Sequence, residues 1–326
     1  MHSHPYPIDA VITWVDGHDP AHQARLDTYL KSIGVASKPN EVSPERLMPC
    51  REIEYCIRSI LRFAPWIRTL FIVTDQQTPS IVNTLKDYLE PNKIRIIDHQ
   101  AIFPNPQHTL PSFNSLAIES VLWRIPELSE TFIYFNDDVI LLRPTKVQDF
   151  FIQEQPVLRG HWKIQSDTKV FQMIQRLIHL GKPKRPSLHR RVQQNSAKLA
   201  GFRKLFFNLT HVPFSLKKSL FEQFFSMHPD LLHENAKHRI RNGDQYSPIS
   251  LIHHLALLEK ISPIDRKKCS LGIDASHHSL KKIQQKFNRA KQKPRYFCLN
   301  IQNLDQAEPT KKDLIFNWLN QMIGKP

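Results

Sequence analysis

Short apolar runs rich in β-branched residues alternate with helical segments through the first 140 residues. The runs cover 8–15, 69–74, 94–97 and 132–135, and helical patterns are expected at 20–33, 51–63 and 114–124. Strands that are apolar along their whole length are buried on both faces, which is typical of parallel sheets covered by helices. This pattern predicts an α/β fold with a mostly parallel, Rossmann-like sheet, followed by a helical, basic C-terminal portion.

Each of the four predicted strands ends in an acidic residue. These residues are Asp16, Asp75, Asp98 and the adjacent pair Asp137 and Asp138. Ligands of parallel sheets bind beyond the carboxyl ends of the strands, so the four ends predict a cation-assisted site for a phosphorylated ligand. Adjacent carboxylates suit Mg²⁺ or Mn²⁺, which prefer oxygen ligands. The alternative is an ordinary turn, because Asn and Asp favour turns.

Charge is distributed unevenly along the chain. The net charge is +15, with 14 Lys/Arg against 18 Asp/Glu in residues 1–150 and 31 against 12 in residues 151–326. We therefore predict two portions, an α/β portion over 1–150 and a basic, mainly helical portion over 151–326. The excess positive charge favours a polyanionic partner such as nucleic acid, an anionic membrane face or a phosphate-rich substrate. A solvated basic surface is the alternative.

The cysteine pattern and the length of the apolar runs indicate the cellular compartment in which the protein is expected. Four cysteines (Cys50, Cys56, Cys269 and Cys298) are too few and too scattered for a disulfide framework or a zinc site. No apolar run is long enough for a membrane span, and no secretory signal is visible. We expect reduced thiols and a cytoplasmic protein.

Several polar groups are candidates for phosphate chemistry. Arg51 and Arg58 share a predicted helix surface, where guanidinium groups can bind phosphate. The alternative is a surface ion pair between Glu54 and Arg58, four residues apart on the helix. Asn114 and Ser115 precede a predicted helix, whose amino terminus can bind an anion or be capped in the ordinary way.

The second portion adds its own polar candidates. His211 is a candidate base, because a neutral imidazole is available near pH 7. Arg239, Arg241 and Asp244 form a compact polar group after a predicted helix.

Several of these stretches together resemble the Stealth family. The resemblance rests on residues 9–17, 51–59, 64–68, 71–75, 110–119 and 134–138, which occur in the family's order. It continues more weakly at 211–214 and 239–244, and in a short stretch at 297–300 that includes Asn300. The sequence is therefore identified as similar to Stealth proteins.

The resemblance implies a sugar-1-phosphate transferase with a nucleotide-sugar transferase-like sheet. In this interpretation residues 1–150 bind the nucleotide sugar, and residues 151–326 complete the site and bind the acceptor. It implies a UDP-sugar donor, a sugar hydroxyl as acceptor, release of UMP, and a phosphodiester-linked capsular or surface polysaccharide as product. Mg²⁺ or Mn²⁺ would be the cofactor, and no nucleic-acid partner is implied. A cytoplasmic site is expected, with peripheral contact to the inner membrane or to capsule assembly machinery.

The resemblance also implies roles for individual residues. The expected catalytic residues are His211, Asp138, Arg58 and Arg241, and the expected metal ligands are Asp137 and Asp138. The expected substrate-binding residues are Asp16, Arg51, Asp75, Asn114, Ser115, Arg239, Asp244 and Asn300.

Two other functions remain open at this point. A nucleotide-sugar glycosyltransferase would share the sheet and the acidic metal site but release UDP. A non-enzymatic polyanion-binding protein would use the basic second portion, and its binding would weaken at high salt without turnover.

Overall fold

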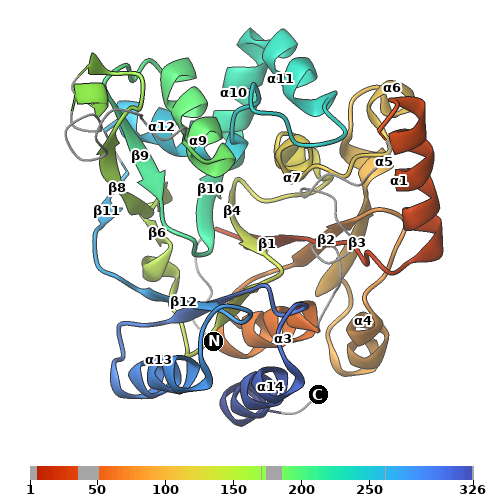
Figure 1. The fold of residues 1–326 in the computed structure, drawn as a ribbon, viewed down its shortest axis with the longest axis vertical. Coiled ribbons are helices and arrows are strands. Elements are labelled where there is room, and N and C mark those ends of the chain that lie inside the picture. Colours follow the sequence, from red (N-terminus) through yellow and green to blue (C-terminus); the bar gives the residue numbers. More distant parts are fainter. Residues whose placement is uncertain (1–5, 36–50, 170, 174–185, 261, 325–326) are drawn as a thin grey trace.

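A five-stranded sheet forms the centre of the molecule (Figure 1). The structure, a computed structural model, describes residues 6–35, 51–169, 171–173, 186–260 and 262–324. Strands β1 (Ile8–Thr13), β2 (Leu70–Thr74), β3 (Ile94–Asp98) and β4 (Thr131–Asn136) are parallel, and β10 (Phe214–Lys217) is antiparallel to β4. The strand order is β10-β4-β1-β2-β3, so the prediction of a mostly parallel sheet is confirmed.

Helices cover both faces of this sheet, as its apolar strands require. The residues of β1 alternate between two cores, with Ile12 in one and Val11 in the other. The Ile12 side packs with α3 (Glu52–Phe63), and the Val11 side packs with α7 (Ser115–Glu119), α10 (Lys218–Met227) and α12 (Pro248–Leu258).

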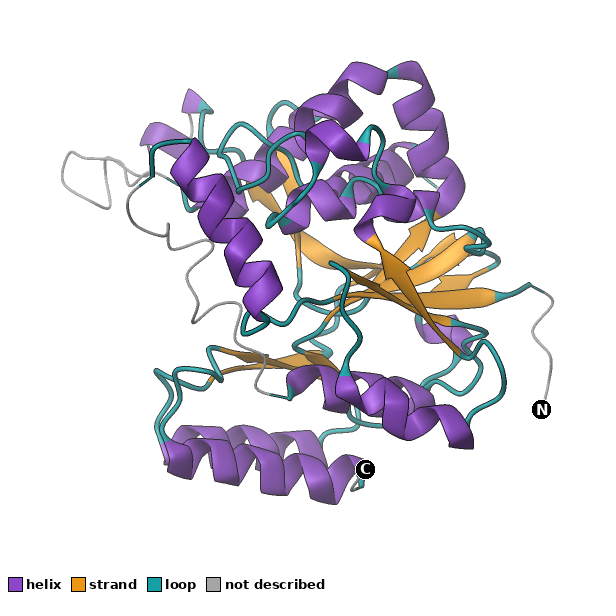
Figure 2. Ribbon diagram, turned by 90° about the vertical axis from the view of Figure 1, so that its right-hand side faces the viewer, coloured by secondary structure: helices purple, strands orange, loops and turns teal. Residues whose placement is uncertain are grey.

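The second portion of the chain contributes to the central sheet and to smaller sheets around it. Its strand β10 completes the five-stranded sheet, and β13 (Cys298–Gln302) pairs with β5 (Val139–Leu141) on one side and β12 (Ser270–Asp274) on the other. Helices α13 (Leu280–Gln292) and α14 (Pro309–Ile323) lie side by side at the foot of the molecule (Figures 1 and 2). The rings of Phe287 and Trp318 stack between them at 4.1 Å.

The other elements are shorter or lie at the periphery. They are α1 (Pro20–Ser32), α4 (Ser80–Leu85), α5 (His99–Ile102), α6 (Pro106–Thr109), α9 (Leu188–Leu199), α11 (Pro229–Ala236), β6 (Phe151–Ile152), β7 (Gln155–Pro156), β8 (Leu158–Ile164), β9 (Leu205–Leu209), β11 (Ile264–Asp265) and the 3-10 turns Lys86–Tyr88, Leu122–Arg124 and Val147–Asp149.

The structure differs from the predicted elements in two places that matter for the site. The pattern after 213 predicts mostly helix, but residues 214–217 form β10, because alternating Phe214 and Leu216 enter the core beside β4. The helix predicted over 114–124 ends at Glu119, and a 3-10 turn follows it. The described cysteines Cys56, Cys269 and Cys298 are free, and Cys50 lies outside the described residues.

Candidate functional site

The site is built around the turn 136–138, where β4 ends and the chain turns into β5. Asp137 and Asp138 are half-buried at the carboxyl end of β4. Helix α3 lies against this turn, since Cys56 Sγ lies 3.8 Å from the carbonyl oxygen of Asn136. The strand end therefore presents two neighbouring carboxylates at the sheet edge where a ligand is expected.

His211 reaches this turn because β10 pairs antiparallel with β4. Phe214 lies opposite Tyr134, so the residues just before β10 lie beside the end of β4. His211 Nε2 is 3.2 Å from Asp138 Oδ1 and 3.3 Å from Asn136 Nδ2. The side chains of His211 and Asp138 are 35% and 25% exposed, so both are within reach of a ligand.

Asn300 approaches the same carboxylate from a third segment. Pairing of β13 with β5 sets Asn300 opposite Val139, next to Asp138. Asn300 Nδ2 donates a hydrogen bond of 2.6 Å to Asp138 Oδ2, and the backbone N–H of Ile301 donates to the Asp138 carbonyl oxygen. The two carboxylate oxygens of Asp138 are therefore held from opposite sides by His211 and Asn300.

The electrostatics of the turn are those of crowded carboxylates beside an imidazole. Burial and the negative charge of Asp138 raise the pKa of Asp137. Burial lowers the pKa of His211, but its hydrogen bond to Asp138 and the surrounding carboxylates outweigh burial, so its pKa is raised. Two neighbouring carboxylates disfavour each other's ionisation, and a bound cation would relieve this repulsion.

Arg241 lies against helix α7. Arg241 Nη2 donates a 2.6 Å hydrogen bond to Ser115 Oγ. Glu119 is one helical turn beyond Ser115 and is buried, so its pKa is raised to about 7, although the positive charges of Arg241 and His211 oppose this shift. Helix α7 thus brings Glu119 under the electrostatic influence of both Arg241 and His211.

Asn114 fixes the position of the loop that carries Arg241. Its side-chain oxygen caps α7 through the Leu116 N–H, and its Nδ2 donates to the His238 carbonyl oxygen and to Gln245 Oε1. Because the amide is buried and engaged at both ends, Asn114 acts through this loop. The prediction that its side chain orients the substrate finds no support in this geometry.

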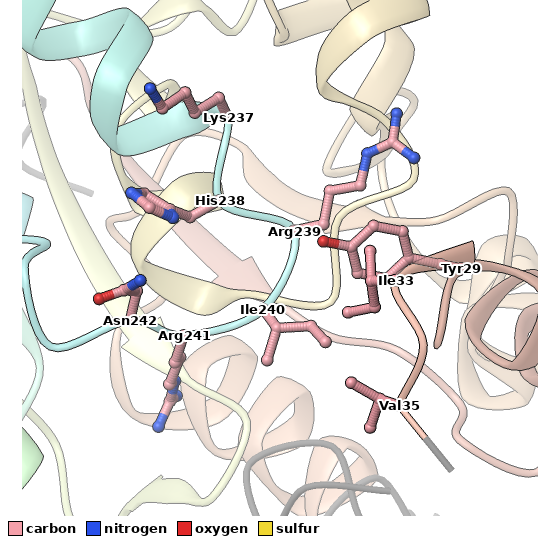
Figure 3. A pocket seen from close by; sticks show the side chains of 9 residues that line it. All are labelled: Tyr29, Ile33, Val35, Lys237, His238, Arg239, Ile240, Arg241 and Asn242. Carbon is pink, nitrogen blue, oxygen red and sulfur yellow. The ribbon is translucent and has the colours of Figure 1, made fainter. Parts of the chain in front are cut away.

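A cavity of about 510 Å³ opens between the carboxyl end of α1 and the loop 237–242. Figure 3 shows Arg239 beside the ring of Tyr29, and Ile33, Val35 and Ile240 directed toward one another. The Arg239 guanidinium lies 5.3 Å from the centre of the Tyr29 ring and also donates to the His108 carbonyl oxygen. Arg241 and Asn242 line the cavity as well, so it adjoins the group that contains Ser115.

The other acidic strand ends are engaged in local structure. Asp16 accepts a hydrogen bond from the backbone N–H of His18. Asp75 is buried between His22 and Arg25 of α1, each within 2.9 Å. Asp98 caps α5 and accepts from the Gln76 N–H. The four ends do share one sheet edge, but the contacts around Asp137 and Asp138 are the ones that form the candidate site.

Arg51 and Arg58 lie on a different side of α3 from the turn 136–138. The helix face that carries Arg51, Tyr55 and Arg58 packs toward α14: Tyr55 donates to Asn320, and the Arg51 guanidinium lies 5.9 Å from the Phe316 ring. Arg58 is buried, and its two Nη atoms have no hydrogen-bond partner among the described residues.

The predicted roles of Arg51 and Arg58 at the catalytic centre are therefore not supported by the structure. Helical periodicity explains the difference, because the turn 136–138 faces the Cys56 side of α3. Glu54 forms an ion pair with Arg51 and not with Arg58, which the alternative interpretation of this helix predicted as its partner.

Asp244 also lies apart from the turn. Its exposed carboxylate pairs with Arg191 Nη2 at 2.7 Å, and no hydrogen bond joins it to the turn among the described residues. Glu119, which lies near Arg241, was not predicted as a site residue, although its helical spacing from Ser115 was an available signal. Asn136, beside His211, was predicted as part of the turn 136–138 but without a role of its own.

Two regions of the chain match family patterns of Stealth proteins. Residues 6–34 match Stealth protein CR1, conserved region 1, and residues 46–158 match Stealth protein CR2, conserved region 2. The second region contains α3, α7 and the turn 136–138.

Curated relatives extend the similarity beyond these regions. An exopolysaccharide phosphotransferase of Lactiplantibacillus plantarum is 28% identical over 94% of this chain and 90% of its own length. A capsular polysaccharide phosphotransferase of Actinobacillus pleuropneumoniae is 41% identical over 44% of this chain, and an exopolysaccharide phosphotransferase of Streptomyces coelicolor is 33% identical over 76% of it. The alignments span 38% and 25% of these two relatives.

A solved galactosyltransferase in complex with donor and acceptor sugar analogues resembles the whole structure weakly. Its TM-score is 0.45 and its sequence identity 11%, and the match covers 98% of this chain and 97% of the other. A similarity this weak carries no argument about activity. The two conserved regions and the relatives carry the assignment instead. The chain belongs to the Stealth family.

Proposed function

We propose that this chain transfers a sugar 1-phosphate from a UDP-sugar to a sugar hydroxyl, forming a phosphodiester in a capsular or surface polysaccharide. The observation that carries the proposal is the constellation of His211, Asp138 and Asn300, which come from three separate segments and meet at the carboxyl end of β4. The names of the relatives, which are phosphotransferases of exopolysaccharide or capsular polysaccharide, support the same reaction class.

The reaction needs a base for the acceptor hydroxyl, and His211 is placed for this role. With its Nε2 proton donated to Asp138 Oδ1, the neutral imidazole keeps a lone pair on Nδ1. The hydroxyl oxygen attacks the phosphorus next to the donor sugar while its proton passes to Nδ1. The bond from that phosphorus to the bridging oxygen of the diphosphate breaks, and UMP leaves with the electron pair. Asp138 orients the imidazole and stabilises the imidazolium that forms.

Arg241 is the cation placed to meet phosphate charge as it redistributes. It is held by Ser115 on α7, so its guanidinium is positioned before substrate arrives. Arg239 and the cavity beside Tyr29 are suited to an anionic or ring-shaped part of a substrate, since a guanidinium and an aromatic face line the same space. We assign this cavity to the acceptor, in keeping with an acceptor-binding role for the portion 151–326.

The acidic turn fits a magnesium ion that is shared with a substrate. Asp137 and Asp138 supply two carboxylates, and no group of three or more His, Cys, Asp or Glu side chains gathers as a metal cage in the described ranges. Mg²⁺ commonly binds one or two carboxylates together with substrate phosphates and water. When bound, it would neutralise the charge of the diphosphate.

Nucleotide release is the experiment that tests the proposal. The protein is incubated with a panel of UDP-sugars, Mg²⁺ and a capsular oligosaccharide, and UMP is resolved from UDP. Acceptor-dependent UMP, lost in His211→Gln, supports sugar-1-phosphate transfer. UDP as the product would replace it with glycosyl transfer. No turnover with any donor, together with salt-sensitive binding to polyanions, would favour the non-enzymatic function.

A further inference from the structure

The outer side of α13 and the strand before it form a dense basic surface. Ten Lys/Arg occur between residues 266 and 295 against one acidic residue, Asp274, and no Asp or Glu occurs from 275 to 304. We call this surface the basic face of α13. It consists of Arg266, Lys267, Lys268, Lys281, Lys282, Lys286, Arg289, Lys291, Lys293 and Arg295.

These side chains are exposed and are not neutralised within the described chain. All ten are exposed except Lys286, which is half-buried. The acidic residues nearest to them in sequence are engaged elsewhere: Asp265 pairs with Arg159, and Asp274 is held by His277 and Asn303. None of the ten forms an ion pair with a carboxylate in the parts of the chain that the structure describes. The surface is therefore a field of uncompensated positive charge.

The charges also gather in space, although they come from separate segments. Partial burial and the nearby charges of Lys282, Lys268 and Arg289 lower the pKa of Lys286. A hydrogen bond from Arg295 and the positive charges of Arg295, Lys268 and Lys293 lower the pKa of Tyr296. The segment before β12 and helix α13 thus present their charges together.

The basic face points away from the catalytic turn. The inner side of α13 buries Ile283, Phe287 and Ala290, and the helix packs against β12 and α14. Asn300, which reaches the turn, lies on β13 beyond β12. Lys281, Lys282 and Arg289 lie on the exposed sides of the helix, whereas Lys286 at its edge donates to the Gly272 carbonyl oxygen of β12. The exposed cations are therefore not a continuation of the substrate site.

The shape and chemistry of this face distinguish between possible anionic partners. It is the outer side of a helix at the foot of the molecule (Figure 1), whereas the 510 Å³ cavity lies elsewhere, between α1 and residues 237–242. The one aromatic residue of α13, Phe287, is buried on its inner side, so the helix offers no exposed ring on which bases or sugar rings could stack. Leu280, at the start of α13, is an exposed apolar side chain at its edge.

We propose that the basic face of α13 is a docking surface for an anionic phospholipid membrane, which holds the protein at the bilayer with the catalytic turn facing away. A layer of anionic phosphate headgroups matches the outer side of a basic helix that has no acidic residue and one exposed apolar residue at its start. No helix among the described residues is long and apolar enough to cross a bilayer. The contact we infer is therefore a surface contact.

Vesicle sedimentation tests the proposal on the full chain. The vesicles are phosphatidylglycerol mixed with phosphatidylcholine, and pure phosphatidylcholine is the comparison. Each basic residue near an anionic surface contributes roughly a fivefold gain in partitioning, so Lys281→Gln/Lys282→Gln/Arg289→Gln is expected to reduce it roughly 100-fold. These side chains are exposed on a helix and Gln is a good helix former, so folding is preserved.

A charge-matched control separates the face from net charge. Lys31→Gln/Arg203→Gln/Lys204→Gln removes three exposed cations from elsewhere and is expected to leave partitioning near the wild-type value. Turnover of a soluble acceptor by the α13 variant is expected to equal that of wild type, because the face lies outside the site.

Three results would overturn the proposal. The first is wild-type binding to phosphatidylglycerol vesicles no stronger than to phosphatidylcholine at about 0.15 M salt. The second is equal loss in the two triple variants. The third is displacement of the protein from vesicles by equimolar polyphosphate or duplex DNA with retention on the polymer, which would assign the face to a soluble polyanion.

Discussion

Replacement of Asn300 by alanine tests whether the carboxylate of Asp138 must be held in place. Asn300 is 3% exposed and donates a 2.6 Å hydrogen bond to Asp138 Oδ2. A hydrogen bond to a charged group contributes about 1.5–3 kcal/mol. If the transition state requires the held carboxylate, that free energy appears in the barrier, and kcat falls about 10- to 150-fold.

The loss is expected in kcat and not in KM. Asp138 acts through His211 on the proton that leaves the acceptor hydroxyl in the transition state. The KM values for acceptor and donor should therefore change little while kcat falls. Asn300→Gln should fail to rescue, because its longer side chain cannot reproduce the bond in a buried position. Release of UMP under saturating donor and acceptor is the assay.

Cys298→Ala is the matched control for the packing change. Cys298 lies two residues before Asn300 on β13, so it faces the same side of the strand, and it is fully buried. In the pairing of β13 with β5, Cys298 lies opposite Leu141 and outside hydrogen-bonding reach of Asp138. Both variants should lower the free energy of unfolding, but only Asn300→Ala should lower kcat. Equal kcat in the two folded variants would refute the role given to Asn300.

Three further predictions concern the metal, the core and pH. Asp137→Asn should raise the Mg²⁺ concentration needed for UMP release, and chelation should abolish release until Mg²⁺ is restored; full activity in chelator would contradict the site. Phe287→Ala should lower the free energy of unfolding by about 3–5 kcal/mol, measured by denaturant titration, because the ring is fully buried against α14. Burial raises the pKa of Glu119 to about 7, so the folded chain holds this proton more tightly than the unfolded chain, and the contribution of Glu119 to stability is lost as pH rises through that value. Glu119→Gln, which cannot ionise, should therefore gain about 3 kcal/mol relative to wild type between pH 4.5 and 7, and a pH-independent difference would show that Glu119 is not buried in this way.

Much of the fold could be predicted from local patterns. The runs at 8–15 and 132–135 are apolar throughout, and strands buried on both faces have few alternatives to a parallel sheet. The turn 136–138 was predicted as the acidic end of a strand, and the structure places it there. These features depend on neighbours in sequence, so sequence periodicity is enough to find them.

The identity of the second-portion residues at the site was predicted, but their partners were not. His211 and Asn300 meet Asp138 because β10 and β13 pair with β4 and β5, and such long-range registers leave no periodic signal in a single sequence. The strand β10 itself was predicted as part of a helical region, since its four residues are too few to show alternation.

The sequence by itself determined the sheet, the acidic strand ends, the uneven charge and the resemblance to Stealth proteins, because each depends on residue type and spacing along the chain. Only the tertiary structure decided which of those groups work together. It paired Asp138 with His211 and Asn300, and it engaged Asp75 with His22. It also placed Arg58 over the ring of Tyr55, whose hydroxyl donates to Asn320 of α14. The reason is physical: a side chain's chemistry is local, but its partners are chosen by strand register and helix packing across the whole chain.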